Sequence, residues 1–151
     1  MKYLVHLAFM FVVFIQPTDS FANEYGGTFV NTEAEKKGEV GKLLLHPTSI
    51  NSYLFSIKVN KGAPSYNSGH LFGEFTVNTG KALYENSNYK FRGKICKWEI
   101  EFKDNSAIIS TLDFNNKCGF GKGVYVDGVY DIRDKNIPES YIDSLGNTQK
   151  F

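Results

Sequence analysis

The feature that most constrains the fold is a two-residue alternation of apolar and charged side chains, clearest in the segment Cys96–Lys103. Successive side chains of a strand point to opposite faces, so this alternation predicts a strand with one buried and one solvated face. Trp98 belongs to the apolar set and Glu99 to the charged set. The same period recurs in short runs separated by Gly, Asn and Asp, and no segment after residue 22 keeps a helical period. These patterns predict an all-β protein.

Eight short antiparallel strands are expected, and they favour a small closed or nearly closed barrel of lipocalin-like or calycin-like type, because closure removes exposed sheet edges. Such a barrel holds side chains or one small ligand, and the many aromatic residues favour side chains. Residues 32–39 form a charged connection, either one turn of helix or a solvated loop, and the tail 133–151 carries enough apolar residues to dock. The expected strands are 24–31, 42–46, 52–59, 71–77, 81–85, 96–103, a run after a turn near residue 105 up to 114, and 124–132.

The hairpin after Lys103 has two possible registers, and a slip of one residue exchanges every side chain between the two faces. A two-residue turn at Asp104-Asn105 uses residues that tolerate the left-handed conformation. It places Ala107, Ile109, Thr111 and Asp113 on the tryptophan face. A three-residue turn at 104–106 places Ile108, Ser110, Leu112 and Phe114 there instead. The three-residue turn buries three large apolar side chains, whereas the two-residue turn buries one and an alanine. Each large apolar side chain gains roughly 1.5–3 kcal/mol on burial. The three-residue turn is therefore predicted, with Cys96 opposite Phe114.

The N-terminal residues 1–22 have the pattern of a secretory signal, with Lys2 before an apolar run and small residues at Ser20 and Ala22. Cleavage near Ala22 would leave one domain, residues 23–151, in the periplasm or outside the cell. No Asn after that point lies in a glycosylation acceptor triplet, which favours a bacterial export route. The net charge of +1 argues against a nucleic-acid partner, and no later apolar stretch is long enough to span a membrane.

Both cysteines, Cys96 and Cys118, follow the predicted cleavage point. An even number of cysteines in an exported chain favours a disulfide. Closing the loop between them would stabilise the fold by roughly 3 kcal/mol on the chain-entropy model. Neither cysteine is placed to carry a lipid anchor.

The densest motif is Cys118-Gly119-Phe120-Gly121-Lys122-Gly123. A phosphate-binding loop would need a helix after the lysine, and usually Ser or Thr next to it, whereas Gly123 and a strand are expected here. The main interpretation is structural: the glycines allow bulges or positive φ at a barrel corner. The alternative is a recognition loop, Gly119, Phe120, Gly121 and Lys122, that presents an aromatic anchor and a charge to a partner.

Catalytic or metal-binding residues do not form a recognisable set. His46 and His70 lie in different segments, without the spacing that places two ligands on one metal. Glu99 and Glu101 share a strand face with Cβ atoms about 7 Å apart, near the spacing of glycosidase carboxylates, but alternating charges beside Lys97 are also typical of a solvated face. We therefore expect no cofactor, no metal and no enzymatic activity, with a glycan-active enzyme as the weaker reading.

From about Ser68 onward the chain resembles a group of small exported bacterial proteins. The residues that carry the resemblance are Gly73-Glu74-Phe75, Asn78–Tyr84, Cys96, Cys118-Gly119-Phe120-Gly121, Val124 and Gly128-Val129-Tyr130. Similar segments occur in the C-terminal parts of some lipoproteins related to lysozyme inhibitors. The resemblance implies an envelope protein with a lipocalin-like or inhibitor-like barrel.

Together these features predict a protein that acts by binding another protein in the envelope. It would be an inhibitor or immunity factor against a lytic enzyme, or an envelope accessory. The alternative function is that of a lipocalin-like carrier of a small apolar ligand.

Overall fold

The computed structural model describes residues 24–91, 94–112 and 118–151. The predicted signal segment lies outside these residues and stays a prediction. Within these described residues, one short helix, α1 (Thr32–Lys36), accompanies ten strands. The strands are β1 (Gly27–Val30), β2 (Val40–Ser49), β3 (Ser52–Asn60), β4 (Ser68–Thr76), β5 (Lys81–Phe91), β6 (Lys94–Lys103), β7 (Ser106–Thr111), β8 (Gly128–Asp134), β9 (Ser140–Ile142) and β10 (Thr148–Lys150).

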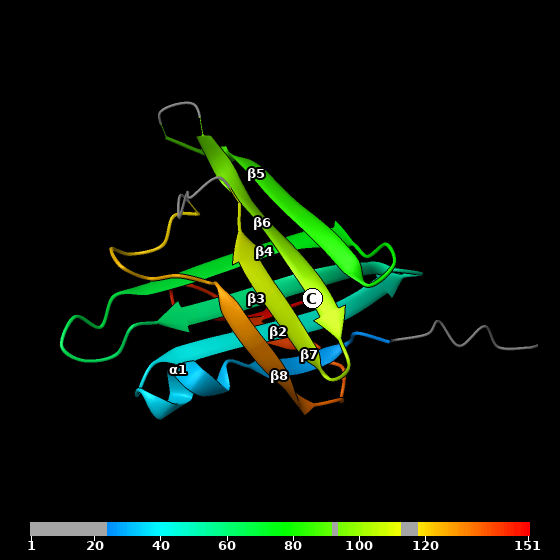
Figure 1. Ribbon diagram of the computed structural model, residues 1–151, viewed down its shortest axis with the longest axis horizontal. Coiled ribbons are helices and arrows are strands. Elements are labelled where there is room, and N and C mark those ends of the chain that lie inside the picture. The colour runs from blue at the N-terminus through cyan, green and yellow to red at the C-terminus, as the bar shows by residue number, and fades with distance from the viewer. Residues whose placement is uncertain (1–23, 92–93, 113–117) are drawn as a thin grey trace, which may run out of the picture.

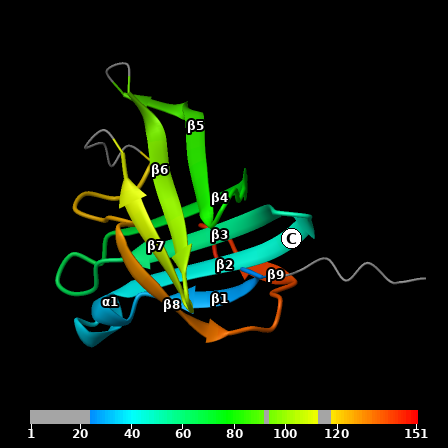
Figure 2. The same ribbon diagram turned by 45° about the vertical axis from the view of Figure 1, so that its right-hand side comes forward.

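Strands β1 to β8 form one antiparallel sheet with the order β4-β3-β2-β1-β8-β7-β6-β5. The sheet curves strongly and nearly closes on itself, as Figures 1 and 2 show from two directions. The prediction of an all-β, nearly closed barrel with about eight strands is confirmed. Several strand boundaries were wrong: β1 begins only at Gly27, β2 spans Val40–Ser49, β4 begins at Ser68 and β5 extends to Phe91. The last barrel strand begins at Gly128 and not at Val124.

Side chains close the seam between β4 and β5, which lie at opposite ends of the sheet order and are not hydrogen-bonded neighbours. Phe55 on β3 pairs in register with Gly73 on β4. The ring of Tyr84 on β5 meets the ring of Phe55 edge-on, with centroids 4.9 Å apart. A Cβ atom on Gly73 would lie only 2.7 Å from Cε2 of Tyr84 and 2.9 Å from Cε1 of Phe55. Gly73 therefore provides the space in which the two rings join the ends of the sheet.

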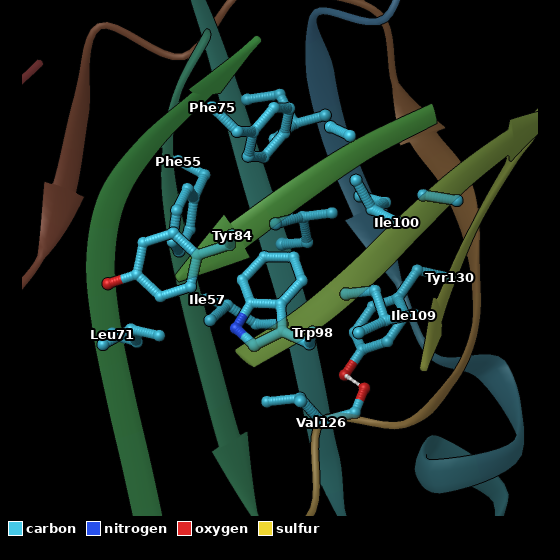
Figure 3. Close-up of a cluster of buried hydrophobic side chains, with 14 of the residues drawn as sticks. Phe55, Ile57, Leu71, Phe75, Tyr84, Trp98, Ile100, Ile109, Val126 and Tyr130 are labelled. Carbon is cyan, nitrogen blue, oxygen red and sulfur yellow. Dashed lines mark hydrogen bonds between the residues drawn. The ribbon is translucent and has the colours of Figure 1, made fainter. Parts of the chain in front are cut away.

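The barrel interior is filled by large side chains (Figure 3). Trp98 is fully buried, and its ring centroid lies 5.2 Å from that of Phe55 and 5.1 Å from that of Tyr84. The inward residues of β3 are also buried, as their alternation predicted: Tyr53, Phe55, Ile57 and Val59. Within the described residues, the indole Nε1 of Trp98 is the one buried side-chain polar atom without a hydrogen-bond partner. Such an atom costs about 1–3 kcal/mol, and the surrounding hydrophobic burial offsets this cost.

The predicted register of the β6–β7 hairpin was wrong. Phe102 pairs with Ala107 and Ile100 with Ile109, so a two-residue turn connects Lys103 to Ser106. Asp104 adopts a φ of 54°, the left-handed conformation that Asp tolerates well. The rings of Trp98 and Phe102 and their neighbours from other strands already occupy the interior, and a close-packed core accepts no further volume without strain. Small Ala107 therefore faces inward. Phe114, the predicted partner of Cys96, lies outside the described residues.

The C-terminal segment docks on the outer face of the barrel, as its apolar residues predicted. Tyr141 on β9 stacks on Phe72 of β4, with ring centroids 4.7 Å apart. Phe151, which follows β10, stacks on His46 of β2 at 5.2 Å. Near the N-terminal end of the barrel, part of the predicted charged connection 32–39 forms α1. The Asn31 side chain caps this helix by accepting a hydrogen bond from the Ala34 N–H at 3.0 Å.

The observed hairpin register makes a prediction about stability. Enlarging the fully buried Ala107 to Leu should lower the free energy of unfolding by about 1–3 kcal/mol, because the core has no room for the added carbons. The control is Ile108→Thr, on the half-buried outer face, which should cost less. Urea unfolding followed by Trp98 fluorescence measures both, and a larger loss for Ile108→Thr would contradict this register.

Candidate functional site

The two cysteines form the predicted disulfide, with Cα atoms of Cys96 and Cys118 4.6 Å apart. Both cysteines are buried. The bond ties the start of the 118–127 segment to β6, inside the barrel wall. The residues of the predicted recognition loop follow directly after this anchor.

The predicted recognition loop, Gly119–Lys122, lies against the first residues of β4. Phe120 is half-buried and packs against Gly69, where an added Cβ atom would lie 2.1 Å from Cδ1 of the ring. The Gly121 N–H donates to the Ser68 carbonyl at 3.0 Å. Asn67 Nδ2 donates to the Lys122 carbonyl at 2.8 Å. The ring thus anchors the loop to the barrel, whereas Lys122 remains exposed.

The glycines of the motif have the structural role that the main interpretation assigned to them. Gly119 has a φ of 79° and Gly123 a φ of 74°, both in the left-handed region that glycine enters without steric cost. Residues 124–127 after the motif contain no helix and lead into β8. The arrangement that a phosphate-binding loop needs is therefore missing here.

Two exposed tyrosines beside this loop were missed by the sequence reasoning. Tyr66 lies in the β3–β4 connection with 69% of its side chain accessible, and Tyr125 lies after the glycine motif with 63% accessible. A single aromatic residue in a polar loop carries no sequence signal that separates it from a core residue. In both ribbon views, residues 61–67, 119–127 and α1 gather at one end of the barrel (Figures 1 and 2).

We call the exposed residues at this end the loop-end surface, which consists of Val40, Lys61, Tyr66, Lys122 and Tyr125. Several short contacts hold it in place. The Tyr66 N–H donates to the Gly62 carbonyl at 2.7 Å, and the Lys61 N–H donates to the Asn67 carbonyl at 2.9 Å. The surface is therefore carried by loops that are hydrogen-bonded to the barrel or to themselves.

A hollow of about 270 Å³ opens within the loop-end surface, between α1, the ends of β2 and β3, and residues 123–127. Lys61 and Tyr125 stand at its rim, and Asn31 and Tyr130 contribute polar groups to its lining. The Tyr130 hydroxyl donates to the Val126 carbonyl at 2.8 Å (Figure 3). Burial raises the pKa of the Tyr130 phenol, so this donor stays protonated and holds residues 126–130 in shape.

The other sequence candidates lie elsewhere. His46 and His70 are both on the outer face of the sheet beneath the C-terminal segment, where His46 Nδ1 lies 2.8 Å from the Pro138 carbonyl and His70 Nε2 lies 2.9 Å from Ser56 Oγ. Glu99 and Glu101 both lie near Lys81, at 3.7 and 3.5 Å, as ion pairs on a solvated face. In the described part of the chain, no group of three or more His, Cys, Asp or Glu side chains could hold a metal ion.

Comparison with models of protein families, with curated proteins and with solved structures finds no match for this chain. Among the described residues, no helix has both the length and the apolar character needed to cross a bilayer.

The contact between Phe120 and Gly69 predicts a measurable coupling. Gly69→Ala should lower the free energy of unfolding by about 1–3 kcal/mol, because the methyl group collides with the ring. In a Phe120→Ala background the same change should cost clearly less, since the ring is gone. A double-mutant cycle by urea unfolding measures the difference, and additivity within about 0.5 kcal/mol would contradict the contact.

The environment of His70 predicts a pH dependence of stability. Burial lowers the pKa of His70, and Lys58 adds to this effect while Asp143 opposes it. The unfolded chain therefore takes up a proton here more readily than the folded chain, so stability is fully present above about pH 6.5 and is lost as the pH falls through the folded-state pKa. Urea unfolding at pH 7.5 and 5.0 should show this loss in the parent protein and a smaller one in His70→Gln; equal losses would refute it.

Proposed function

We propose that this chain is an exported protein that binds another protein through its loop-end surface, and that the partner is a lytic enzyme which it inhibits or neutralises. The disulfide supports export, because such bonds persist in oxidising compartments. The resemblance of Cys118–Gly121 and Gly128–Tyr130 to segments of lipoproteins related to lysozyme inhibitors suggests which class of enzyme to test first. A role as an envelope accessory that binds a different protein remains the broader form of the same proposal.

The observation that carries the proposal is the pair of exposed tyrosines on anchored loops. Tyrosine is among the residue types that supply most binding energy at protein interfaces, and it loses little conformational entropy on binding. Tyr66 and Tyr125 are the two most exposed aromatic side chains of the described residues. Because their loops are hydrogen-bonded to the barrel, ordering them on association would cost little free energy.

The two lysines of the loop-end surface favour acidic groups on the partner, while Glu39 and Asp127 line the hollow itself. Lys61 and Lys122 are exposed, and neither forms an ion pair within the described residues. Opposite charge on a partner would steer the encounter and set its orientation. Val40, 46% accessible, adds apolar area beside the same hollow.

The packing of the interior favours a binding surface over a carrier of an apolar ligand. Trp98, Phe55 and Tyr84 occupy the centre of the barrel, where a lipocalin-like carrier would need a vacant cavity. The hollow in the loop-end surface has a mixed polar and apolar lining and is open to solvent. It is better suited to a side chain of a partner than to an apolar small molecule.

The proposal is tested with purified peptidoglycan hydrolases of different classes. Their rates of cell-wall lysis are measured as turbidity loss with increasing amounts of the protein. Inhibition of at least one enzyme is expected, and Tyr66→Ala or Tyr125→Ala should weaken it at least tenfold, because loss of an interface anchor costs about 2 kcal/mol or more.

The matched control is Ile50→Ala, which removes a 70% exposed apolar side chain at the opposite end of the barrel. This variant should inhibit as well as the parent. Lack of inhibition across the panel would remove the lytic-enzyme partner from the proposal. An equal loss in Ile50→Ala would remove the loop-end surface.

A further inference from the structure

Three basic side chains form a row across neighbouring strands on the outer face of the barrel. Lys42 on β2 lies directly opposite Lys58 on β3, and Lys58 lies directly opposite His70 on β4. We call these three residues the basic row. Both lysines are exposed and His70 is half-buried. None of the three forms an ion pair within the described residues.

The pairing of Lys42 with Lys58 is unfavourable for stability, because like charges directly opposite on antiparallel strands repel each other. The far half of the sheet shows the usual solution. There Lys81 on β5 pairs with Glu99 and Glu101 on β6, and Lys97 on β6 pairs with Glu85 on β5. Among the residues that the structure describes, no carboxylate forms such an ion pair with the basic row.

The carboxylate of Asp143, which lies close to His70, is already engaged. Asp143 contributes to the electrostatics of His70, but its Oδ1 accepts hydrogen bonds from the backbone N–H groups of Leu145 and Asn147, both at 2.9 Å. Its Oδ2 accepts a further bond from Gln149 Nε2 at 2.9 Å. The carboxylate thus holds the β9–β10 turn together, and its pKa is lowered by these hydrogen bonds.

Lys58 stands between two hollows. One, of about 270 Å³, is shared by Lys42, Lys58, Ser56 and residues 140–142. The other, of about 610 Å³, lies between Lys58, His70 and the β9–β10 turn, and its lining includes Asn60, Ser68 and Asp143. The larger hollow is within the range of about 300–1,000 Å³ typical of small-molecule sites. It is rich in groups that donate hydrogen bonds.

The His70 ring is held in a defined orientation at this place. Its Nε2 lies 2.9 Å from Ser56 Oγ, and Ser56 is itself 4% exposed. The Tyr141 ring stacks on the His70 ring, with centroids 5.7 Å apart and an interplanar angle of 15°. The row therefore combines two exposed ammonium groups with one oriented imidazole.

We propose that Lys58 and His70 bind an oxyanion, a phosphate or carboxylate group, of a small polar ligand seated in the hollow beside the β9–β10 turn. Lys42, opposite Lys58 on β2, adds positive charge beside this hollow. The two ammonium groups match the charge of such a group, and the ammonium groups and the imidazole supply hydrogen-bond donors. The anion would take the place of a carboxylate partner and reduce the repulsion between the two lysines. This site lies outside the loop-end surface and requires no protein partner.

The test uses inorganic phosphate, acetate and chloride as separate probes at constant ionic strength, with thermal unfolding as the measurement. Phosphate, acetate or both should raise the Tm of the parent protein along a saturating curve, by about 3–6 °C at ten times Kd. The probe with the lower Kd identifies whether the group is a phosphate or a carboxylate. A rise that stays linear with concentration reflects exclusion of the salt from the protein surface and would overturn the site.

Two variants separate the site from a general salt effect. Lys58→Gln should bind the effective anion at least tenfold more weakly, while its Tm without anion should equal or exceed that of the parent, because a like-charge contact is removed. Lys103→Gln removes another exposed lysine that forms no ion pair within the described residues, and it should respond like the parent. Equal anion responses in Lys58→Gln and the parent would sink the proposal.

Discussion

The structure depends on the packing of aromatic rings between two strands that are not hydrogen-bonded neighbours in the sheet. Strands β4 and β5 end the sheet on either side of this seam, and Tyr84 reaches over Gly73 to contact Phe55. Aromatic contacts of this kind add about 0.5–1.5 kcal/mol beyond the area they bury. These contacts also bring the two ends of the curved sheet together, so that Trp98 is enclosed in the barrel interior. A larger residue at Gly73 would push the rings apart, so closure depends on the absence of a side chain at that position.

Strand β4 has a second glycine that leaves room for an aromatic ring, nearer the loop end of the barrel. Gly73 accepts the Tyr84 ring, and four residues earlier Gly69 accepts the Phe120 ring. Both glycines stand at inward-facing positions of β4, because residues an even number apart share one face of a strand. The disulfide fixes the segment just before Phe120, so a covalent bond and a half-buried ring hold the first half of the glycine-rich motif. The exposed side chains beyond it are thereby carried on a rigid base.

Much of the fold could be predicted from the sequence, because strand alternation and cysteine count are local signals. The β6–β7 register could not, because the choice between Ala107 and Ile108 depends on how much volume other strands bring to the interior. Phe120 was expected at a partner-facing surface, and only its partner Gly69, distant in sequence, reveals that it anchors the loop. The basic row could not be predicted either, because its residues are also far apart in the sequence. Lys42, Lys58 and His70 become neighbours only once the pairing of three strands is known.

Because side chains fill the interior, the outer surface is where a ligand or partner would bind. The two halves of the outer face differ in how their charges are paired. In the β5–β6 half, lysines and carboxylates compensate each other and the surface needs no partner. In the β2–β4 half, Tyr141 and Phe151 of the C-terminal segment cover Phe72. The segment leaves Lys42 and Lys58 exposed, and its Asp143 carboxylate forms hydrogen bonds within the β9–β10 turn. A segment that served only to cover the sheet could have paired this carboxylate with Lys58. That it does not is the physical reason to look for an external anion at this place.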